Sequence, residues 1–298
     1  MLLFWRQRRT WWTAAFLYGS LVLSAPSQKW NLAHGAPSDI DPRALSPLGS
    51  GPSSNFAKRG LTTQAVIEEW TAMGDSYASG VGAGTASSDN KQCRRFSDAY
   101  GNLMNKDPRL GASSGHKFNG VYCSGSSFKN IHAGGPYSQV DQMGNPSVAT
   151  LTIGGNNVGF RDILTACIYK FYPFGRNGDC NQVLQDSSNK IANDDFKQGL
   201  SKAIKDSLDH AKKSEFRLYV TSYAAFFNED TTQCDKVSVA MWYSSGGYWT
   251  QDLRKRMNRV LAQLNAKIKE VAGTFDKNKV TYVDVDHLYN THRFCEQP

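Results

Sequence analysis

Short apolar runs alternate with long amphipathic stripes along this chain, and that alternation limits the fold more than any other feature. Two stripes with apolar residues three or four apart, 196–211 and 253–271, predict helices, and Gly273 is a natural stop for the second. Strand-like runs lie at 67–73, 118–123 (the weakest), 147–153, 216–221 and 279–283. Strands alternating with helices predict an α/β fold: a central parallel sheet in a three-layer α/β/α sandwich.

The first residues read as a targeting segment. Arg6, Arg8 and Arg9 precede an apolar run, 11–25, that ends in small residues, which is the pattern of a secretory signal peptide over 1–25. The run has about fifteen residues, fewer than the ~20 that span a bilayer as a helix. A signal anchor is therefore the weaker alternative, and we expect no stable membrane anchor.

Residues 26–59 are rich in Pro, Ser, Gly and Ala and show no sustained periodicity. This composition predicts a disordered linker or propeptide, followed by one folded domain over 60–298. The linker ends in the dibasic pair Lys58-Arg59, which is either a processing site or part of an uncut linker.

The net charge of +8 overstates the basicity of the folded part. The first 59 residues hold seven Lys/Arg and two Asp/Glu, so the remainder carries 27 basic and 24 acidic residues, a net +3. This charge is too small and too dispersed for a nucleic-acid binder.

All six cysteines follow the linker, and an even count in a secreted chain predicts a disulfide framework. Six cysteines allow fifteen connectivities, so their number does not fix the pairing. No pair has Cys-x-x-Cys spacing, which leaves a zinc or redox site with little support.

Three polar blocks follow strand-like runs. Ser76 lies in Gly-Asp-Ser directly after 67–73, Asn156 lies in Gly-Gly-Asn-Asn after 147–153, and His292 follows the last run at some distance. A serine, an amide and a histidine are the parts of a nucleophile, an oxyanion donor and a general base. Because the carboxyl ends of parallel strands share one edge of a sheet, the blocks can meet there.

With a fourth block around Gly125, residues 65–297 or so resemble the SGNH (GDSL) family of esterases and lipases. The family's Ser, Gly, Asn and His fall on Ser76, Gly125, Asn156 and His292. The resemblance implies a flavodoxin-like fold and a secreted, extracellular, monomeric serine esterase or lipase without cofactor or metal. Its substrate would be a carboxylic ester, either a lipid or an acylated carbohydrate.

The same resemblance assigns the roles. Ser76 would form the acyl-enzyme, with His292 as general base. The backbone N–H groups of Ser76 and Gly125 and the side-chain amide of Asn156 would form the oxyanion hole. Glycine suits position 125 because a backbone that approaches the substrate closely leaves no room for a side chain.

The resemblance further implies the disulfides Cys93–Cys123, Cys167–Cys180 and Cys234–Cys295. The last bridge would tie the segment after His292 to the body of the domain and restrain the base.

Two positions depart from the family pattern. Relatives often carry an aspartate three residues before the histidine, where this chain has Tyr289, and Asn157 stands where an aspartate commonly follows the amide. We expect a main-chain carbonyl near Tyr289 to orient the imidazole, with the carboxylate of Asp286 or Asp284 as the alternative.

Two other functions stay open from the sequence. Because Tyr289 stands where relatives often carry an aspartate, the first alternative is a catalytically silent binding protein or effector on the same fold. A metal-dependent hydrolase is conceivable around Asp284, Asp286 and His287, although an incidental acidic loop explains that trio as well. The aromatic segments 171–174 and 241–249 either line a substrate groove or cover the edges of the core.

Overall fold

The computed structural model describes residues 67–88, 91–107, 115–135, 137–170, 172, 177–240 and 247–296. They belong to the compact unit Val66–Pro298. The signal peptide, the linker with Lys58-Arg59 and the start of the domain at Gly60 lie outside the described residues, so these remain predictions.

Five parallel strands form the central sheet, in the order β2-β1-β3-β4-β5. Each strand overlaps one of the strand-like runs of the sequence. This order is the flavodoxin-like one, so the predicted α/β fold is confirmed. The strands are β1 (Glu69–Gly74), β2 (Lys117–Gly120), β3 (Val148–Thr152), β4 (Arg217–Thr221) and β5 (Val280–Val283).

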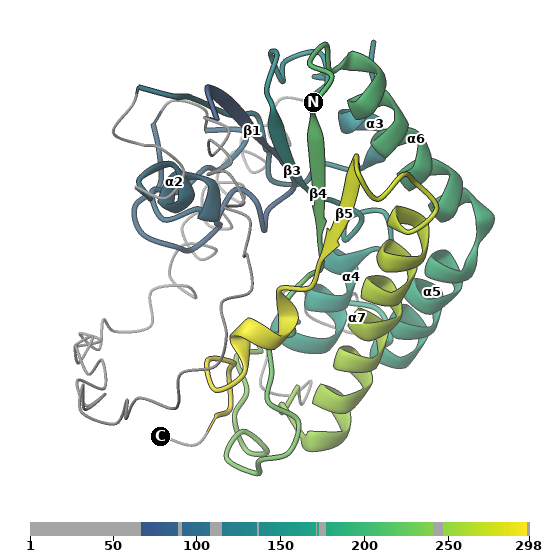
Figure 1. The fold of residues 1–298 in the computed structure, drawn as a ribbon. Coiled ribbons are helices and arrows are strands. Elements are labelled where there is room, and N and C mark those ends of the chain that lie inside the picture. Colours follow the sequence, from purple (N-terminus) through teal and green to yellow (C-terminus); the bar gives the residue numbers. More distant parts are fainter. Residues whose placement is uncertain are drawn as a thin grey trace, which may run out of the picture. The chain divides into compact units, whose positions relative to one another are not determined.

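Helices lie on both sides of this sheet: α3, α5, α6 and α7 on one side and α2 on the other (Figure 1). The two predicted stripes are α6 (Asp194–His210) and α7 (Gln251–Ala272). The remaining elements are α2 (Tyr100–Asn105), α3 (Phe128–Ile131), α4 (Phe160–Ile163), the π-helix η3 (Leu164–Tyr169), α5 (Cys180–Ala192) and the 3₁₀ helix η5 (Asp286–Tyr289).

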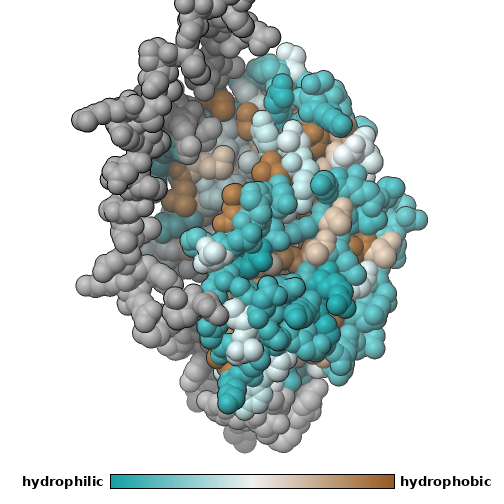
Figure 2. Space-filling model, turned by 60° about the horizontal axis from the view of Figure 1, so that its bottom comes forward, coloured by the Kyte–Doolittle hydropathy of each residue, from teal (hydrophilic) through white to brown (hydrophobic). Residues whose placement is uncertain are grey.

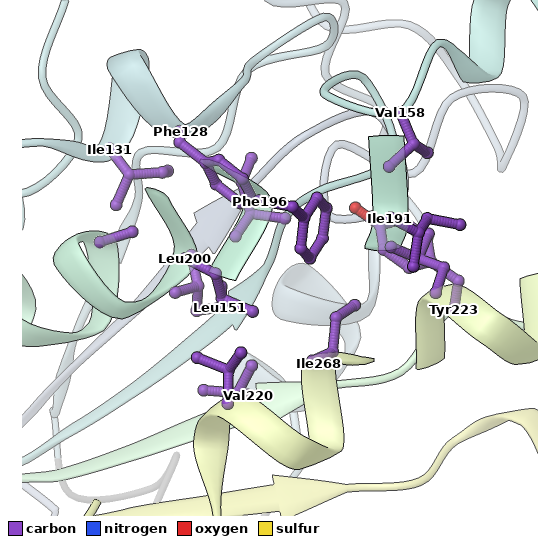
Figure 3. Close-up of a cluster of buried hydrophobic side chains, with 14 of the residues drawn as sticks. Phe128, Ile131, Leu151, Val158, Ile191, Phe196, Leu200, Val220, Tyr223 and Ile268 are labelled. Atoms are coloured by element: carbon purple, nitrogen blue, oxygen red, sulfur yellow. The ribbon is translucent and has the colours of Figure 1, made fainter. Parts of the chain in front are cut away.

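The main core lies between the sheet and the larger helical layer. Leu151 and Val220 point from the strands towards Leu200 on α6 and Ile268 on α7, with the ring of Phe196 among them (Figure 3). Burying each such side chain stabilises the fold by about 1.5–3 kcal/mol. The opposite faces of the helices are polar, and the surface in Figure 2 is mainly hydrophilic with small separate hydrophobic patches.

Three disulfides, Cys93–Cys123, Cys167–Cys180 and Cys234–Cys295, are present, which is the pairing that the family resemblance implied. No helix in the described part of the chain is long and apolar enough to cross a membrane.

Candidate active site

Ser76 lies in the turn after β1, at the carboxyl edge of the sheet. Gly74 ends the strand with φ +143°, and a Cβ there would lie 2.3 Å from the carbonyl oxygen of Thr152. Only glycine therefore lets the backbone approach β3 so closely. The Asp75 N–H donates to the same carbonyl at 3.0 Å, which fixes the turn. Ser76 is partly exposed, and its hydroxyl forms no hydrogen bond with any described residue.

Gly125 lies on an exposed turn after β2. Its φ of +88° favours glycine, and a Cβ at this position would meet nothing within 4 Å, so the space in front of it is open to a ligand. Asn156 follows β3, and its amide Nδ2 donates to the carbonyl of Ser126 at 2.8 Å. An amide nitrogen has two hydrogens, so one N–H of Asn156 stays available for a developing oxyanion.

The buried side chain of Gln139 joins the nucleophile turn to these two segments. Its Oε1 accepts the Gly74 N–H at 2.7 Å, and its Nε2 donates to the Gly74 carbonyl at 2.8 Å and to Ser126 Oγ at 3.0 Å. Because the Ser126 carbonyl in turn holds the amide of Asn156, Gln139 fixes the serine and the amide relative to one another.

A second buried connection runs through Tyr223, which follows β4. Its hydroxyl donates to Asp75 Oδ2 at 2.5 Å and accepts the Gly155 N–H at 2.9 Å. The side chain of Asn265, on α7, holds the Tyr223 backbone by accepting its N–H at 2.9 Å and donating to its carbonyl at 2.8 Å. Tyr223 thus links the residue just before the serine to the residue just before the amide, while Gln139 links Gly74 to the segment that holds the Asn156 side chain.

Burial governs the ionisation of Asp75 and Tyr223, the two titratable residues of this second connection. Removal from water raises the pKa of Asp75 to about 7, although hydrogen bonds from Tyr223 and from the Tyr77 N–H partly offset the rise. Burial, together with the neighbouring Asp75 carboxyl, also raises the pKa of Tyr223 well above its ordinary value. The phenol therefore remains a donor, while Asp75 titrates near neutral pH.

His292 lies on an exposed turn between η5 and the chain end. Its Nδ1 bonds to the carbonyl of Asn290 at 3.1 Å. A carbonyl can only accept, so Nδ1 carries the proton in this contact and Nε2 is left as the basic nitrogen. The Tyr289 carbonyl accepts the main-chain N–H of His292 at 2.9 Å instead of bonding to the ring. The acceptor for the imidazole is a main-chain carbonyl one residue beyond Tyr289.

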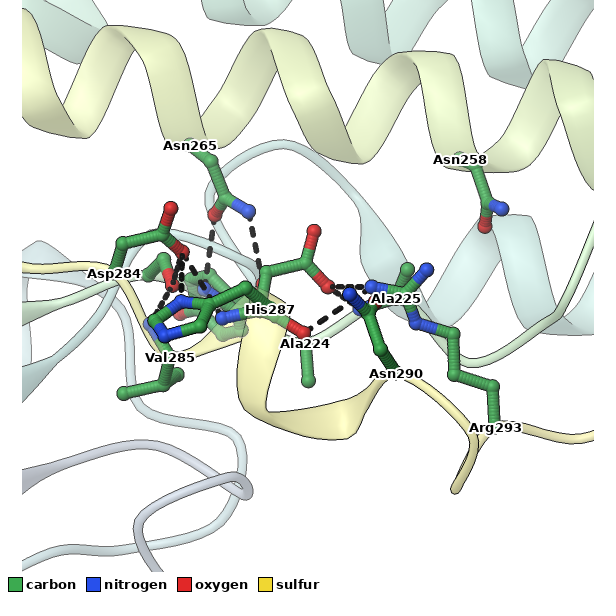
Figure 4. A network of polar contacts seen from close by, with 12 residues as sticks. Ala224, Ala225, Asn258, Asn265, Asp284, Val285, His287, Asn290 and Arg293 are labelled. Atoms are coloured by element: carbon green, nitrogen blue, oxygen red, sulfur yellow. Dashed lines mark hydrogen bonds and ion pairs between the residues drawn. The ribbon is translucent and has the colours of Figure 1, made fainter.

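The histidine turn is anchored on both sides. Before it, Asp286 Oδ1 accepts the Ala225 N–H at 2.8 Å and pairs with Arg293 at 2.7 Å, in the network shown in Figure 4. After it, the Phe294 N–H donates to the Phe226 carbonyl at 2.7 Å, and Cys295 is bridged to Cys234. The Asp286 carboxylate forms no hydrogen bond with His292 in the described part of the chain. Its contacts position the whole turn instead of the imidazole.

The segments that contain Ser76 and His292 come from opposite ends of the domain, and Phe226 contacts both segments. The ring of Tyr77 stacks on Phe226 with centroids 5.7 Å apart, and Phe226 holds Phe294 through its carbonyl. The serine–histidine hydrogen bond is not formed, and in enzymes without substrate such bonds are often long and tighten only in the complex.

The acidic loop has a different arrangement from a metal site. Asp284 accepts the Ser222 hydroxyl at 3.3 Å and lies 4.0 Å from His287, while Asp286 pairs with Arg293. Among the described residues no three His, Cys, Asp or Glu side chains gather so that they could hold an ion.

Of the aromatic segments, only Tyr172, Tyr248 and Trp249 are described, and Trp249 packs against Phe227 and Phe294. The other aromatic residues of 171–174 and 241–249 lie outside the described residues.

Known proteins match this chain in sequence and in fold. The sequence model of the GDSL-like Lipase/Acylhydrolase family matches residues 72–297, which contain all four proposed site residues. The chain belongs to this family. Other relatives are a lipase from Streptomyces rimosus, 36% identical over 102 residues, and lipase 1 from Streptomyces coelicolor, 34% identical over 106 residues. Each match spans about a third of this chain and of the relative (33% and 34%; 35% and 36%).

Two solved structures share the fold of this chain over most of their length. Phospholipase A1 from Streptomyces albidoflavus NA297 has a TM-score of 0.59 and 25% identity, covering 77% of this chain and 84% of that one. The extracellular lipase from Streptomyces rimosus has a TM-score of 0.57 and 21% identity, covering 76% and 84%.

Proposed function

We propose that this protein is a secreted serine esterase or lipase that hydrolyses carboxylic esters through an acyl-enzyme on Ser76. The observation that carries the proposal is the buried network of Gln139 and Tyr223, which fixes the serine turn against the amide segment at one edge of the sheet. A network that holds three oxyanion donors in register supplies the preorganisation that acyl transfer requires.

In the proposed mechanism, Nε2 of His292 removes the hydroxyl proton as Ser76 attacks the ester carbonyl. The Asn290 carbonyl keeps the proton on Nδ1 and so leaves Nε2 free to act as the base. The tetrahedral oxyanion is bound by the N–H groups of Ser76 and Gly125 and by the Asn156 amide. His292 then protonates the leaving alcohol, and water releases the acid by the same steps. No cofactor takes part.

Export is supported by three disulfides, which form in oxidising compartments, and by the name of one similar structure, the extracellular lipase from Streptomyces rimosus. The lipases and the phospholipase A1 among the relatives make lipid esters the first substrates to try, with acetylated carbohydrates second.

Hydrolysis of p-nitrophenyl butyrate by the full-length chain tests the proposal. Ser76→Ala and His292→Ala should each lose activity by at least about 10³-fold. The matched control is Ser214→Ala, an exposed serine ahead of β4 and so at the opposite edge of the sheet, which should keep full activity. Equal rates in the parent and Ser76→Ala would remove Ser76 as nucleophile. A folded parent without activity would favour the silent binding protein, and loss of activity with chelator would favour the metal-dependent hydrolase.

A further inference from the structure

The mechanism above does not use an apolar pocket whose lining includes Tyr77, the residue after the proposed nucleophile. This pocket has a volume of about 40 Å³. One wall comes from Tyr77, the residue after the serine, and another from Val158 and Phe160, which follow the amide segment. Phe226, after β4, and Leu261, on α7, complete it with their neighbours. Residues that follow Ser76 and Asn156 in the chain therefore line the same pocket.

The polar groups in its lining are already satisfied. The Tyr77 hydroxyl donates to the Ala224 carbonyl at 3.1 Å. The Asn258 amide donates to the Phe227 carbonyl at 2.9 Å and to the Glu229 carboxylate at 2.8 Å. The remaining lining side chains are aromatic or aliphatic. A polar ligand would find no free partner here, so the pocket is suited to hydrocarbon.

The walls are also rigid. The Tyr77 ring meets Tyr223 edge-on at 4.7 Å and stacks on Phe226 at 5.7 Å, while Phe160 packs against both Tyr77 and Phe226.

The volume of the pocket limits the size of its ligand. A water-sized group needs about 10–15 Å³ of such space, so the pocket holds roughly three groups of methylene size.

We propose that this pocket binds a short acyl chain of about four carbons, and that Leu261 limits the chain length. The inference rests on the proposed function, because it places the acyl group of the same ester. Leu261 is the candidate gate since it is only half-buried, whereas Met257, Val260 and Leu264 beside it on α7 are buried.

The test is the ratio of kcat/KM for p-nitrophenyl acetate, butyrate and octanoate with the full-length chain. In the parent, kcat/KM for butyrate should exceed the values for acetate and octanoate by about tenfold. Each methylene that fits an apolar pocket strengthens binding of the transition state, and the extra carbons of octanoate do not fit. Leu261→Trp should remove the preference for butyrate over acetate. Leu261→Ala should raise octanoate relative to butyrate by at least about fivefold, and it keeps the inference testable if the tryptophan variant does not fold.

The matched control is Ala262→Trp, an exposed neighbour on the same helix that does not line the pocket. It should keep the parent's ratios. A parent that prefers octanoate, or ratios that stay unchanged in both Leu261 variants, would overturn the inference. If the ratios fail in this way while Ser76→Ala is inactive, only the pocket inference fails. If Ser76→Ala stays active, the proposed function itself fails.

Discussion

The buried carboxyl of Asp75 should make the stability of this protein depend on pH, and Asp75→Asn should remove that dependence. A carboxyl whose pKa is higher in the folded protein than in the unfolded chain binds more protons when folded. The free energy of unfolding therefore falls as pH rises between the two values. The pKa rises from 3.8 to about 7, so the carboxylate costs about 4 kcal/mol once it is fully ionised. More than half of this loss falls between pH 5 and pH 8.

The measurement is equilibrium urea unfolding of parent and Asp75→Asn at pH 5 and pH 8, with disulfides intact. Asparagine has nearly the same shape and can still accept the Tyr223 hydroxyl, but it does not titrate. Other titrating groups contribute equally to both proteins and cancel in the difference. The stability of the parent relative to the variant should fall by about 2–3 kcal/mol from pH 5 to pH 8. A difference that stays constant within about 0.5 kcal/mol would refute the assignment of a buried, poorly solvated carboxyl.

Two further predictions concern the groups that hold the site. Gln139→Leu, which removes three hydrogen bonds at the serine turn, should lower kcat about 10–100-fold and leave KM within about twofold. Steady-state kinetics beside Gln142→Leu, an exposed glutamine of the same loop, measures this, and an unchanged kcat would contradict the positioning role. Replacing Cys234 and Cys295 together by serine opens a loop of 61 residues and should lower the free energy of unfolding by about 4 kcal/mol. Urea unfolding measures that loss, and a value below about 1 kcal/mol would be inconsistent with a bridge that closes this loop in the folded protein.

The sequence predicted those parts of the fold that have a periodic signal. The strands and the helices α6 and α7 bury regular apolar positions, so their pattern is visible without coordinates. Helix α5 has no such pattern because Ser187 occupies one of its few buried positions, where its hydroxyl donates back to the Val183 carbonyl at 2.9 Å. The π-helix η3 also lacked a signal, since a change of helical period depends on the surroundings.

The residues of the proposed site also differ in whether the sequence pattern reveals them. Ser76, Asn156 and His292 stand out because each lies in a polar block after an apolar run, and Gly125 because of the family resemblance. Gln139 has no comparable signal, since a single glutamine in a loop looks like any surface residue until it is found buried.

Tyr223 had a partial signal, because it lies two residues after β4, at the edge of the sheet where the other blocks lie. Asn265 interrupts the apolar face of α7. Its role in holding the Tyr223 backbone is visible only from its two hydrogen bonds in the structure. Which polar residues are buried together depends on tertiary packing, and the sequence pattern does not encode it directly.

The central claim is that Ser76 is an activated nucleophile, and labelling by a fluorophosphonate tests it most directly. Such a probe reacts with a serine whose hydroxyl is deprotonated by a neighbouring base, and peptide mass spectrometry locates the adduct. We predict one adduct, on the peptide containing Ser76, that is formed by the full-length parent and disappears in His292→Ala. Labelling of another serine, or no labelling of the folded parent, would contradict the account.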